Sequence, residues 1–281
     1  MKIAVLGSIN LDLVASGAPL PRAGETVSGA CLDRHPGGKG ANQAFAAARL
    51  GGDVALFGRT GADGMADESL SLLRSLGADL RGVVADPDLA TGVALIAVSP
   101  EGENQITVCS GANAAVIPPP LIGADALICQ LEIPVATVAA AFDAFAGFAV
   151  ANLAPAVPVP EALLARADLL VVNEPEAAFY GQALLRSPGL VAITLGARGA
   201  ELWKMGRKIA EASPPSVAVV DTTGAGDVFV AALTVALVDG MTPQAALDFA
   251  CAAGALATTR AGAQPSAPSR AEVNAVLEDR R

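Results

Sequence analysis

Short apolar segments alternate with Ala-rich helical segments along most of the chain. The clearest apolar segments each end in glycine or polar residues, and they read DVALFGRTG, DALICQLE, GFAVANLAP, DLLVVNEPE and LVAITLGARG. Strands that alternate with helices are typical of a mostly parallel sheet covered by helices. Because ligands of such sheets bind beyond the carboxyl ends of the strands, we expect the polar tails of these segments to form a site.

Residues 91–111, with the sequence TGVALIAVSPEGENQITVCSG, interrupt this alternation. Two apolar runs flank the polar turn PEGEN, which is the pattern of a β-hairpin rather than of a strand followed by a helix. Together with ETVSGACLDR, residues 25–34, this hairpin is expected to form a small separate sheet.

The segment VVDTTGAGDVFVAALTVAL, residues 219–237, places two carboxylates around a Gly-Ala-Gly turn. After the turn, apolar side chains recur at three- and four-residue steps, at Phe229, Ala232, Leu233, Ala236 and Leu237. This period predicts a helix that begins near Gly226, and SVAVV, residues 216–220, predicts a short buried strand before it.

A strand-to-helix turn of this kind presents the free N–H groups of a helix N-terminus and is therefore an anion site. Gly224 and Gly226 lack side chains that would keep a phosphate from the backbone. Asp227 lies in the first helical turn, where it would repel that phosphate; the alternative is that it caps the helix and complements its dipole.

The composition is apolar enough to require a search for a membrane span. Hydrophobic residues make up 53% of the 281 residues, charged residues make up 16%, and the mean hydropathy is +0.50. The best candidate, residues 133–154, contains Asp143 and Gly147 and has no basic flanks, so it predicts a helix, a turn and a buried strand. The N-terminal MKIAVLGSINLDLV predicts a first strand rather than a signal peptide, and we therefore expect a cytoplasmic protein.

The charge and the reactive residues narrow the function further. A net charge of −10 opposes binding to nucleic acids or anionic membranes, which need clustered Lys and Arg, and favours a small-molecule partner. Cys31, Cys109, Cys129 and Cys251 are too scattered for a zinc site or a disulfide framework and are expected in the core. The single histidine, His35, opposes a Ser-His-Asp or zinc protease site and is expected in a loop.

Two further polar clusters are candidates for a ligand site. Asn10 and Asp12 lie two residues apart at a strand end, so their side chains share a face roughly 6–7 Å apart. That spacing suits two hydroxyls of a sugar, although a satisfied strand end is the alternative. A glycine turn and a helix from about Ala41 are predicted by PGGKGANQAFAAARLGG. Lys39 and Asn42 could reach a polyhydroxylated ligand there, because the glycines let the backbone approach it closely. The alternative is that the glycines only shape a turn. Neither a Walker A loop nor a G-x-G-x-x-G fingerprint is present.

Seven motifs occur in the order seen in the ribokinase-like sugar kinases: GSINLD, PGGKGANQA, ATGVAL, QLE, NEPE, TLGARG and DTTGAGD. The chain resembles that family over nearly its whole length. The resemblance implies a single kinase domain over residues 1–281, with a three-layer α/β/α fold, a mostly parallel central sheet and a small β-sheet lid. The lid strands would come from about 10–16, 25–34 and 91–110, and a homodimer through this lid is expected.

The resemblance also implies phosphoryl transfer from ATP, with Mg2+, to the primary hydroxyl of a sugar. Asp227 would accept the proton of that hydroxyl, and Gly224, Ala225 and Gly226 would hold the phosphate charge. The positions that match the sugar contacts of the family are Asn10, Asp12, Gly38, Lys39, Asn42 and Glu132.

The remaining matched positions concern the nucleotide and a metal ion. Asn173 and Glu176 match contacts to ATP and to magnesium, although a helix cap with a capping-box partner explains the same pair. The nucleotide loop is matched by Thr194, Leu195, Gly196, Ala197, Arg198 and Gly199, and Cys251 stands beside the adenine where these kinases often have His. A potassium site would be formed by Asp221, Thr223, Ala257, Arg260, Gly262 and Ser266, with loop capping by Asp221 as the alternative.

Two segments are short for this family, residues 113–125 and 177–191. Three functions remain open on the sequence. The first is phosphorylation of ribose, and the second is phosphorylation of deoxyribose, a nucleoside or, less favoured for lack of a basic cluster, a sugar phosphate. The third is sugar binding without catalysis, which the short segments allow and the intact DTTGAGD motif opposes.

Overall fold

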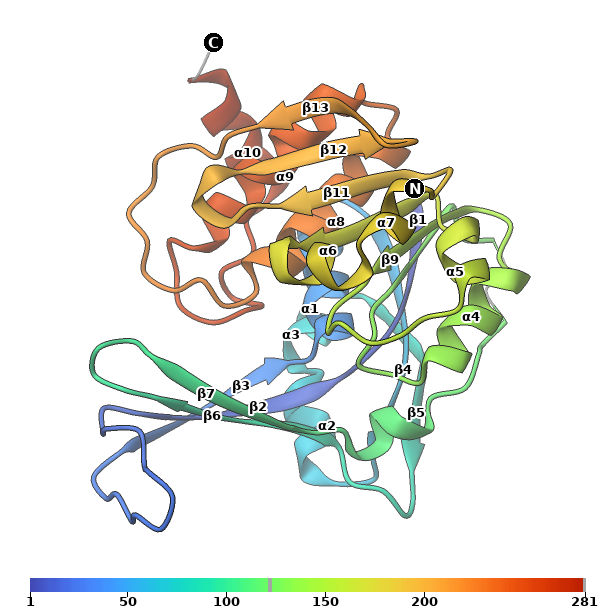
Figure 1. Cartoon of the computed structure of the whole chain (residues 1–281). Helices are drawn as coiled ribbons and strands as arrows, with labels where there is room; N and C mark the ends of the chain where they lie inside the picture. The colour runs from blue at the N-terminus through green and yellow to red at the C-terminus, as the bar shows by residue number, and fades with distance from the viewer. Residues whose placement is uncertain (121–122, 280–281) are drawn as a thin grey trace.

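A nine-stranded sheet forms the body of the protein (Figure 1). The computed structural model describes residues 1–120 and 123–279. In spatial order the strands are β13 (Arg207–Ala212), β12 (Ala200–Lys204), β11 (Leu190–Thr194), β10 (Leu169–Asn173), β9 (Phe148–Asn152), β8 (Ala126–Cys129), β1 (Lys2–Leu6), β4 (Asp53–Gly61) and β5 (Asp79–Asp86). The strands from β5 to β11 run parallel, and β12 and β13 continue the sheet antiparallel. The predicted mostly parallel sheet is therefore confirmed.

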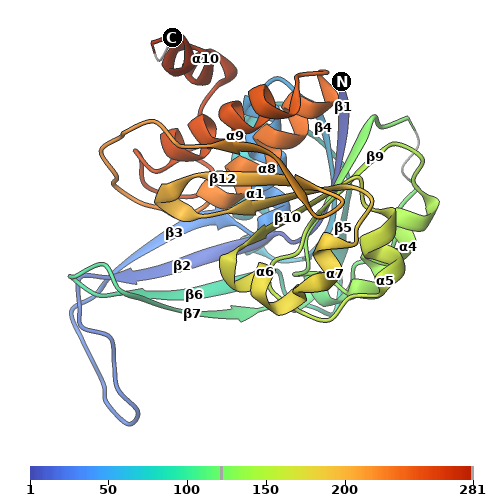
Figure 2. The ribbon, with the colours of Figure 1, turned by 45° about the horizontal axis from the view of Figure 1, so that its top comes forward.

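Helices cover both faces of this sheet, as Figure 2 shows. One face packs against α1 (Lys39–Arg49), α3 (Ser71–Ser75), α8 (Ala225–Val238), α9 (Pro243–Ala257) and α10 (Arg270–Glu278). The other face packs against α4 (Val135–Ala144), α5 (Glu161–Arg166), α6 (Glu174–Tyr180) and α7 (Gln182–Leu185). The short helix α2 (Gly64–Ser69) contacts the small sheet instead. The two hydrophobic clusters between these layers form the core.

Helix α8 is enclosed on all sides. Its residues 227–236 are all buried, and it packs against α1 and α9. A helix that is hydrophobic all round needs such an interior position. The helical spacing of Phe229, Ala232 and Leu233 identified only one of its buried faces. The helix begins at Ala225, within a residue of the predicted start, so Asp227 enters the protein interior with the first turn.

The small sheet extends away from the body (Figure 1) and contains four strands. They are β3 (Cys31–Gly37), β2 (Asn10–Ser16), β6 (Gly92–Val98) and β7 (Asn104–Cys109), in that order. Strands β6 and β7 form the expected hairpin, whereas β2 pairs with β6 in parallel. The strand expected at 25–34 begins six residues later, at Cys31, so His35 lies in a strand rather than in the predicted loop.

The prediction of a buried strand at 216–220 was wrong. These residues form no strand, and Val219 and Val220 are 62% and 66% exposed. Strand β13 already completes the sheet, and Pro214 and Pro215 after it cannot donate ladder hydrogen bonds. The expectation that all four cysteines are core residues was also wrong, because Cys31 and Cys109 are exposed on the small sheet.

The apolar segment 133–154 folds as predicted, into α4 followed by β9. Within the part of the chain that the structure describes, no helix has the length and hydropathy needed to cross a membrane. The short segment 177–191 holds the end of α6, α7 and the start of β11. In the other short segment, the described residues 116–120 and 123–125 contain no helix, and a cavity of about 760 Å³ lies over β1, β4 and β5.

Candidate active site

The N-terminus of α8 lies where three parts of the chain meet. The N-cap, Gly224, has φ 77°, and a Cβ added to it would lie 2.7 Å from Cα of Ala263. This position therefore needs glycine for its backbone conformation and for the close approach of another loop. At Gly226, by contrast, an added Cβ would meet nothing within 4 Å, so this residue faces open space. Only the second glycine plays the predicted part of leaving room for a ligand.

The carboxylate of Asp227, which is 8% exposed, accepts hydrogen bonds from two consecutive residues of α1. Asn42 Nδ2 donates to Oδ2 at 3.0 Å, and Gln43 Nε2 donates to Oδ1 at 2.9 Å. The helix α1 begins at Lys39, two residues before the predicted start, with Gly38 as its N-cap. This start places Asn42 and Gln43 in the first turns of α1, facing α8.

Three side chains that sequence reasoning missed support these two amides, and a fourth supports Asn10. Gln264 Nε2 donates to Asn42 Oδ1 at 3.3 Å, and Gln130 Nε2 donates to Gln43 Oε1 at 2.7 Å. Gln43 Nε2 also donates to Asn152 Oδ1 at 3.0 Å. On the other side, Asn113 Nδ2 donates to Asn10 Oδ1 at 2.8 Å. The signal in the sequence was weak: each is an amide next to an otherwise apolar or small-residue stretch.

The predicted sugar-contact residues come together beside Asp227. Gly38, with φ 86°, packs so closely on the β1–β2 loop that an added Cβ would lie 2.7 Å from Asn10 N. A Cβ added to the preceding Gly37 would lie 2.2 Å from the Asp12 carboxylate. Glu132 reaches the same place, because its Oε2 accepts from Ser8 Oγ at 2.6 Å and from Lys39 N at 3.2 Å.

The pocket is rich in carboxylates, and this affects their protonation. Burial, together with the nearby charges of Glu132 and Asp227, raises the pKa of Asp12 to about 7. Asp227 raises the pKa of Lys39 against the opposing effect of burial, with further contributions from Glu132 and Glu176. The Lys39 ammonium is thus surrounded by carboxylates, and a neutral ligand that donates hydroxyl hydrogens matches such a pocket.

The predicted phosphate and magnesium residues form a helix cap and line a cavity as well. Asn173 is the N-cap of α6, and a capping box joins it to Glu176, with both hydrogen bonds at 2.8 Å. Burial raises the pKa of Glu176 in spite of this hydrogen bond and of Lys39. Both residues line a cavity of about 150 Å³ together with Lys39, Gly226 and Asp227. The capping interpretation is therefore confirmed, and the ligand interpretation stays a prediction that this position in the cavity permits.

A larger cavity, of about 660 Å³, adjoins the first and shares Thr194 and Gly226 with it. Gly196, Ala197, Gly199 and Cys251 also line it, as the nucleotide prediction requires. Leu195 and Arg198 do not line it, and the Arg198 guanidinium is paired with Glu174. Apolar residues such as Val217, Val219 and Phe229 complete the wall, which suits the flat face of a nucleobase.

Five of the six residues of the predicted potassium site lie on two loops that Asp221 joins, and the sixth, Ala257, ends α9. Its carboxylate accepts from Thr223 N at 2.9 Å and from Gly262 N at 2.8 Å. Burial opposes ionisation of Asp221, but these hydrogen bonds outweigh it and lower its pKa. The loop-capping alternative is therefore realised, while each carboxylate oxygen keeps a lone pair for a cation.

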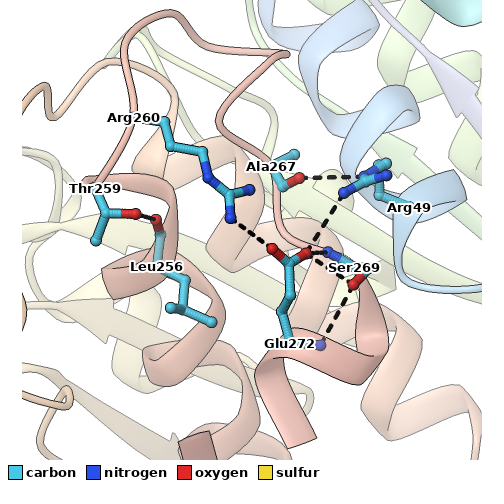
Figure 3. A network of polar contacts seen from close by, with 7 residues as sticks. All are labelled: Arg49, Leu256, Thr259, Arg260, Ala267, Ser269 and Glu272. Atoms are coloured by element: carbon cyan, nitrogen blue, oxygen red, sulfur yellow. Dashed lines mark hydrogen bonds and ion pairs between the residues drawn. The ribbon is translucent and has the colours of Figure 1, made fainter. Parts of the chain in front are cut away.

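The other residues of the predicted potassium site lie on or next to the loop that follows α9. Ser266 N donates to Gly262 O at 3.3 Å, and Ala257 is the last residue of α9. The Arg260 side chain turns away to pair with Glu272, which also contacts Arg49 and Ser269 (Figure 3). Only the backbone oxygen of Arg260 is thus available to a cation.

Replacement of Asp12 by Asn should change stability in a pH-dependent way. The pKa of Asp12 is about 7 in the folded protein, against an ordinary value of 3.8 that applies to the unfolded chain. At pH values between the two, the folded state therefore binds a proton that the unfolded state has lost. The wild-type contribution of Asp12 is therefore favourable at low pH and is lost as the pH rises through about 7. We expect the Tm of Asp12→Asn, relative to wild type without ligands, to increase from pH 4 to pH 8. Asp143→Asn, on the exposed side of α4, is the control; a Tm difference for Asp12→Asn that is equal at both pH values contradicts this account.

Comparison with known proteins places this geometry in a family. A sequence model of the pfkB family of carbohydrate kinases matches residues 1–270. The ribokinase of Bacillus subtilis is 37% identical over 98% of this chain and 99% of its own, and the deoxyribokinase of Salmonella typhi is 32% identical over 99% of each. The structure of Arabidopsis thaliana ribokinase complexed with ribose and ATP matches with a TM-score of 0.89, at 31% identity, over 99% of this chain and 98% of that one. Matches of this extent in sequence and structure show that the chain belongs to the pfkB family of carbohydrate kinases.

Proposed function

We propose that this protein transfers the γ-phosphoryl group of ATP to the primary 5-hydroxyl of D-ribose, giving ribose 5-phosphate and ADP. The observation that carries the proposal is the position of Asp227. It stands at the N-terminus of α8, between the polar pocket of Asn10 and Asp12 and the cavity that leads to the nucleotide loop. The similarity to ribokinases supports ribose as the acceptor.

In this proposal Asp227 accepts the proton of the sugar hydroxyl as its oxygen attacks phosphorus. The turn of Gly224, Ala225 and Gly226 offers the Gly226 N–H and the positive end of the α8 dipole to the transferring phosphoryl group, while the Ala225 N–H donates to Thr222 O at 3.3 Å. Asn10, Asp12, Asn42 and Glu132 bind the sugar hydroxyls, and Lys39 balances the negative charge around them. This arrangement would hold the attacking oxygen, the phosphorus and the leaving oxygen of ADP near one line, and such positioning supplies much of the rate acceleration in phosphoryl transfer.

Magnesium is expected to enter with ATP rather than to occupy a site made by the protein. Among residues 1–120 and 123–279, no group of three or more His, Cys, Asp or Glu side chains is placed to hold a metal ion. Glu176 fits the remaining role, because Mg2+ is commonly bound by one or two carboxylates plus phosphate oxygens and waters. The ion would neutralise charge on the transferred phosphate. ATP as the phosphoryl donor is also consistent with the expected cytoplasmic location.

Three alternatives remain for the acceptor, namely deoxyribose, a nucleoside and a sugar phosphate, and one specific relative favours the first. The deoxyribokinase of Salmonella typhi supports deoxyribose as a second candidate substrate. A sugar phosphate is less favoured, because Arg34 is already paired with Glu68 at 2.7 Å and Arg22 is exposed. Sugar binding without catalysis is opposed by the two hydrogen bonds that hold Asp227 in the cavity.

Replacement of Asp227 by Asn is expected to reduce turnover by at least about 100-fold while ribose still binds, since the amide keeps the size of the carboxylate but cannot accept the proton. Release of ADP with ribose, deoxyribose, fructose, fructose 6-phosphate, adenosine and inosine is the measurement, and Asp143→Asn is the control. Near-normal turnover in the variant would remove Asp227 from the proposed role. No turnover of wild type on any of these acceptors would favour the non-catalytic alternative.

Potassium is proposed to bind between the Asp221 turn and the loop that follows α9. The donors fit a large, weakly hydrated cation, because they are a carboxylate, a hydroxyl and backbone carbonyls on two loops that Asp221 ties together. An ion there would neutralise Asp221 and stiffen the turn before Gly224 without contact to the sugar.

We therefore expect potassium to raise turnover several-fold over sodium or a bulky organic cation at equal ionic strength. In Asp221→Ala this difference should disappear, because the charged ligand is gone. Turnover of dialysed enzyme in the three salts is the measurement, and the circular dichroism spectrum establishes that the variant is folded. Equal wild-type rates in all three salts contradict a cation site.

A homodimer through the small sheet is proposed from its exposed apolar side chains. Leu32 and Leu95 are 65% and 47% exposed, and the strand register places both on the face opposite Asn10 and Asp12. Light scattering at micromolar concentration should give the mass of a dimer. The double variant Leu32→Asp/Leu95→Asp should be monomeric, whereas Val84→Asp, on β5 of the large sheet, should not. A wild-type monomer at that concentration would contradict this proposal.

A further inference from the structure

A chain of buried amide side chains surrounds Asp227 on both sides. On one side Gln130 donates to Gln43, and Gln43 donates to Asp227 Oδ1. On the other side Gln264 donates to Asn42, and Asn42 donates to Asp227 Oδ2. Gln43, Gln130 and Gln264 are at most 1% exposed. Each carboxylate oxygen is thus held by one amide, and that amide is held by another.

The direction of these hydrogen bonds is set by the charge of Asp227. An ionised carboxylate only accepts hydrogen bonds, so the amides of Asn42 and Gln43 must both turn their N–H groups towards it. Their oxygens then point outward and require N–H donors, which Gln264 and Gln130 supply. The negative charge of Asp227 therefore decides, for all four amides, which end carries the N–H group towards the carboxylate.

The cost of this orientation appears at the two ends. Within the described residues, the buried side-chain atoms that find no hydrogen-bond partner are Gln130 Oε1 and Gln264 Oε1. Rotation of either amide would place two oxygens against each other, so the cost is not relieved. An unpaired buried acceptor destabilises the fold, and packing alone gives no reason for two of them beside one carboxylate.

Gln43 has the most constrained position in the chain of amides. Its two N–H hydrogens are both used, one by Asp227 Oδ1 at 2.9 Å and one by Asn152 Oδ1 at 3.0 Å, and its oxygen accepts from Gln130 at 2.7 Å. Asn152 in turn donates to the backbone oxygen of Val171. The amide of Gln43 therefore joins α1, β9 and Gln130, the residue directly after β8, to the first turn of α8.

We propose that Gln43 is a positioning residue for phosphoryl transfer, which fixes the Asp227 carboxylate so that its free lone pairs point into the cavity shared with Lys39. Gln130 keeps the Gln43 amide in the orientation that this role requires. The inference rests on the proposed kinase function for its catalytic consequence. The orientation of the amides around Asp227 does not depend on the identity of the sugar.

The test replaces Gln43 by Met, which keeps the length of the side chain but removes its donors and acceptor. We expect kcat to fall by about 10- to 100-fold, while KM for the sugar and for ATP changes by less than about threefold, because Gln43 acts on the base and not on either substrate. Thr234→Val is the matched control. It removes a buried hydroxyl of the same helix, whose partner is Val230 O, without contact to Asp227.

A double-mutant cycle separates positioning from a general structural role. If Gln43 acts through Asp227, Gln43→Met should have no further effect on the residual turnover of Asp227→Asn. A merely structural role would lower that residual turnover by the same factor as in the wild-type background. An equal factor in both backgrounds, a change confined to KM, or an unchanged kcat would overturn the proposal.

The same four proteins give a readout that needs no activity. The Tm loss from Gln43→Met should be larger with Asp227 present than in Asp227→Asn, because the substitution leaves a buried carboxylate oxygen without its donor only in the first case. If wild type turns over no acceptor, the proposed function fails and this comparison still decides the inference. Equal Tm losses in the two backgrounds would overturn it.

Discussion

The burial of one negative charge, the Asp227 carboxylate, constrains much of this structure. A carboxylate removed from water is costly unless hydrogen bonds and opposite charge replace the solvent. Here the replacements are the N-terminus of α8, two amides from α1 and the ammonium of Lys39. The two amides and the ammonium come from α1, so they require α1 and α8 to lie close together; accordingly residues 40–47 of α1 and 227–236 of α8 are buried.

Two glycines set the position of α1 relative to the sheet. A Cβ on Gly40 would lie 2.6 Å from Gly7 C and Ser8 N, and a Cβ on Gly7 would lie 2.8 Å from Gly40 Cα. These contacts are backbone atoms that no side-chain rotation can relieve. The start of α1 therefore rests directly on the end of β1, at the depth from which Asn42 and Gln43 reach Asp227. The glycines of the GGKGAN motif thus serve helix placement as much as access for a ligand.

The sequence predicted the parts of the structure that depend on local pattern. Alternation of apolar and polar segments identified the parallel sheet, the hairpin of β6 and β7, and the start of α8. It failed at residues 216–220, because a five-residue apolar run carries no information on whether the sheet has space for another strand. The amides around Asp227 were beyond local reasoning, since Gln43 and Asp227 are 184 residues apart and Gln264 and Asn42 are 222 apart.

The carboxylates of the pocket show why binding chemistry and stability oppose each other here. Burial and like charge raise the pKa of Asp12 to about 7, which means that the folded protein resists ionisation of this group in the absence of a ligand. Lys39 is a single cation among Asp12, Glu132, Glu176 and Asp227, so it cannot balance them all. Hydroxyl hydrogens of a sugar are donors without charge, and in the proposed function they would give these carboxylate oxygens further hydrogen bonds. A ligand of this kind would remove the instability that its own binding residues create.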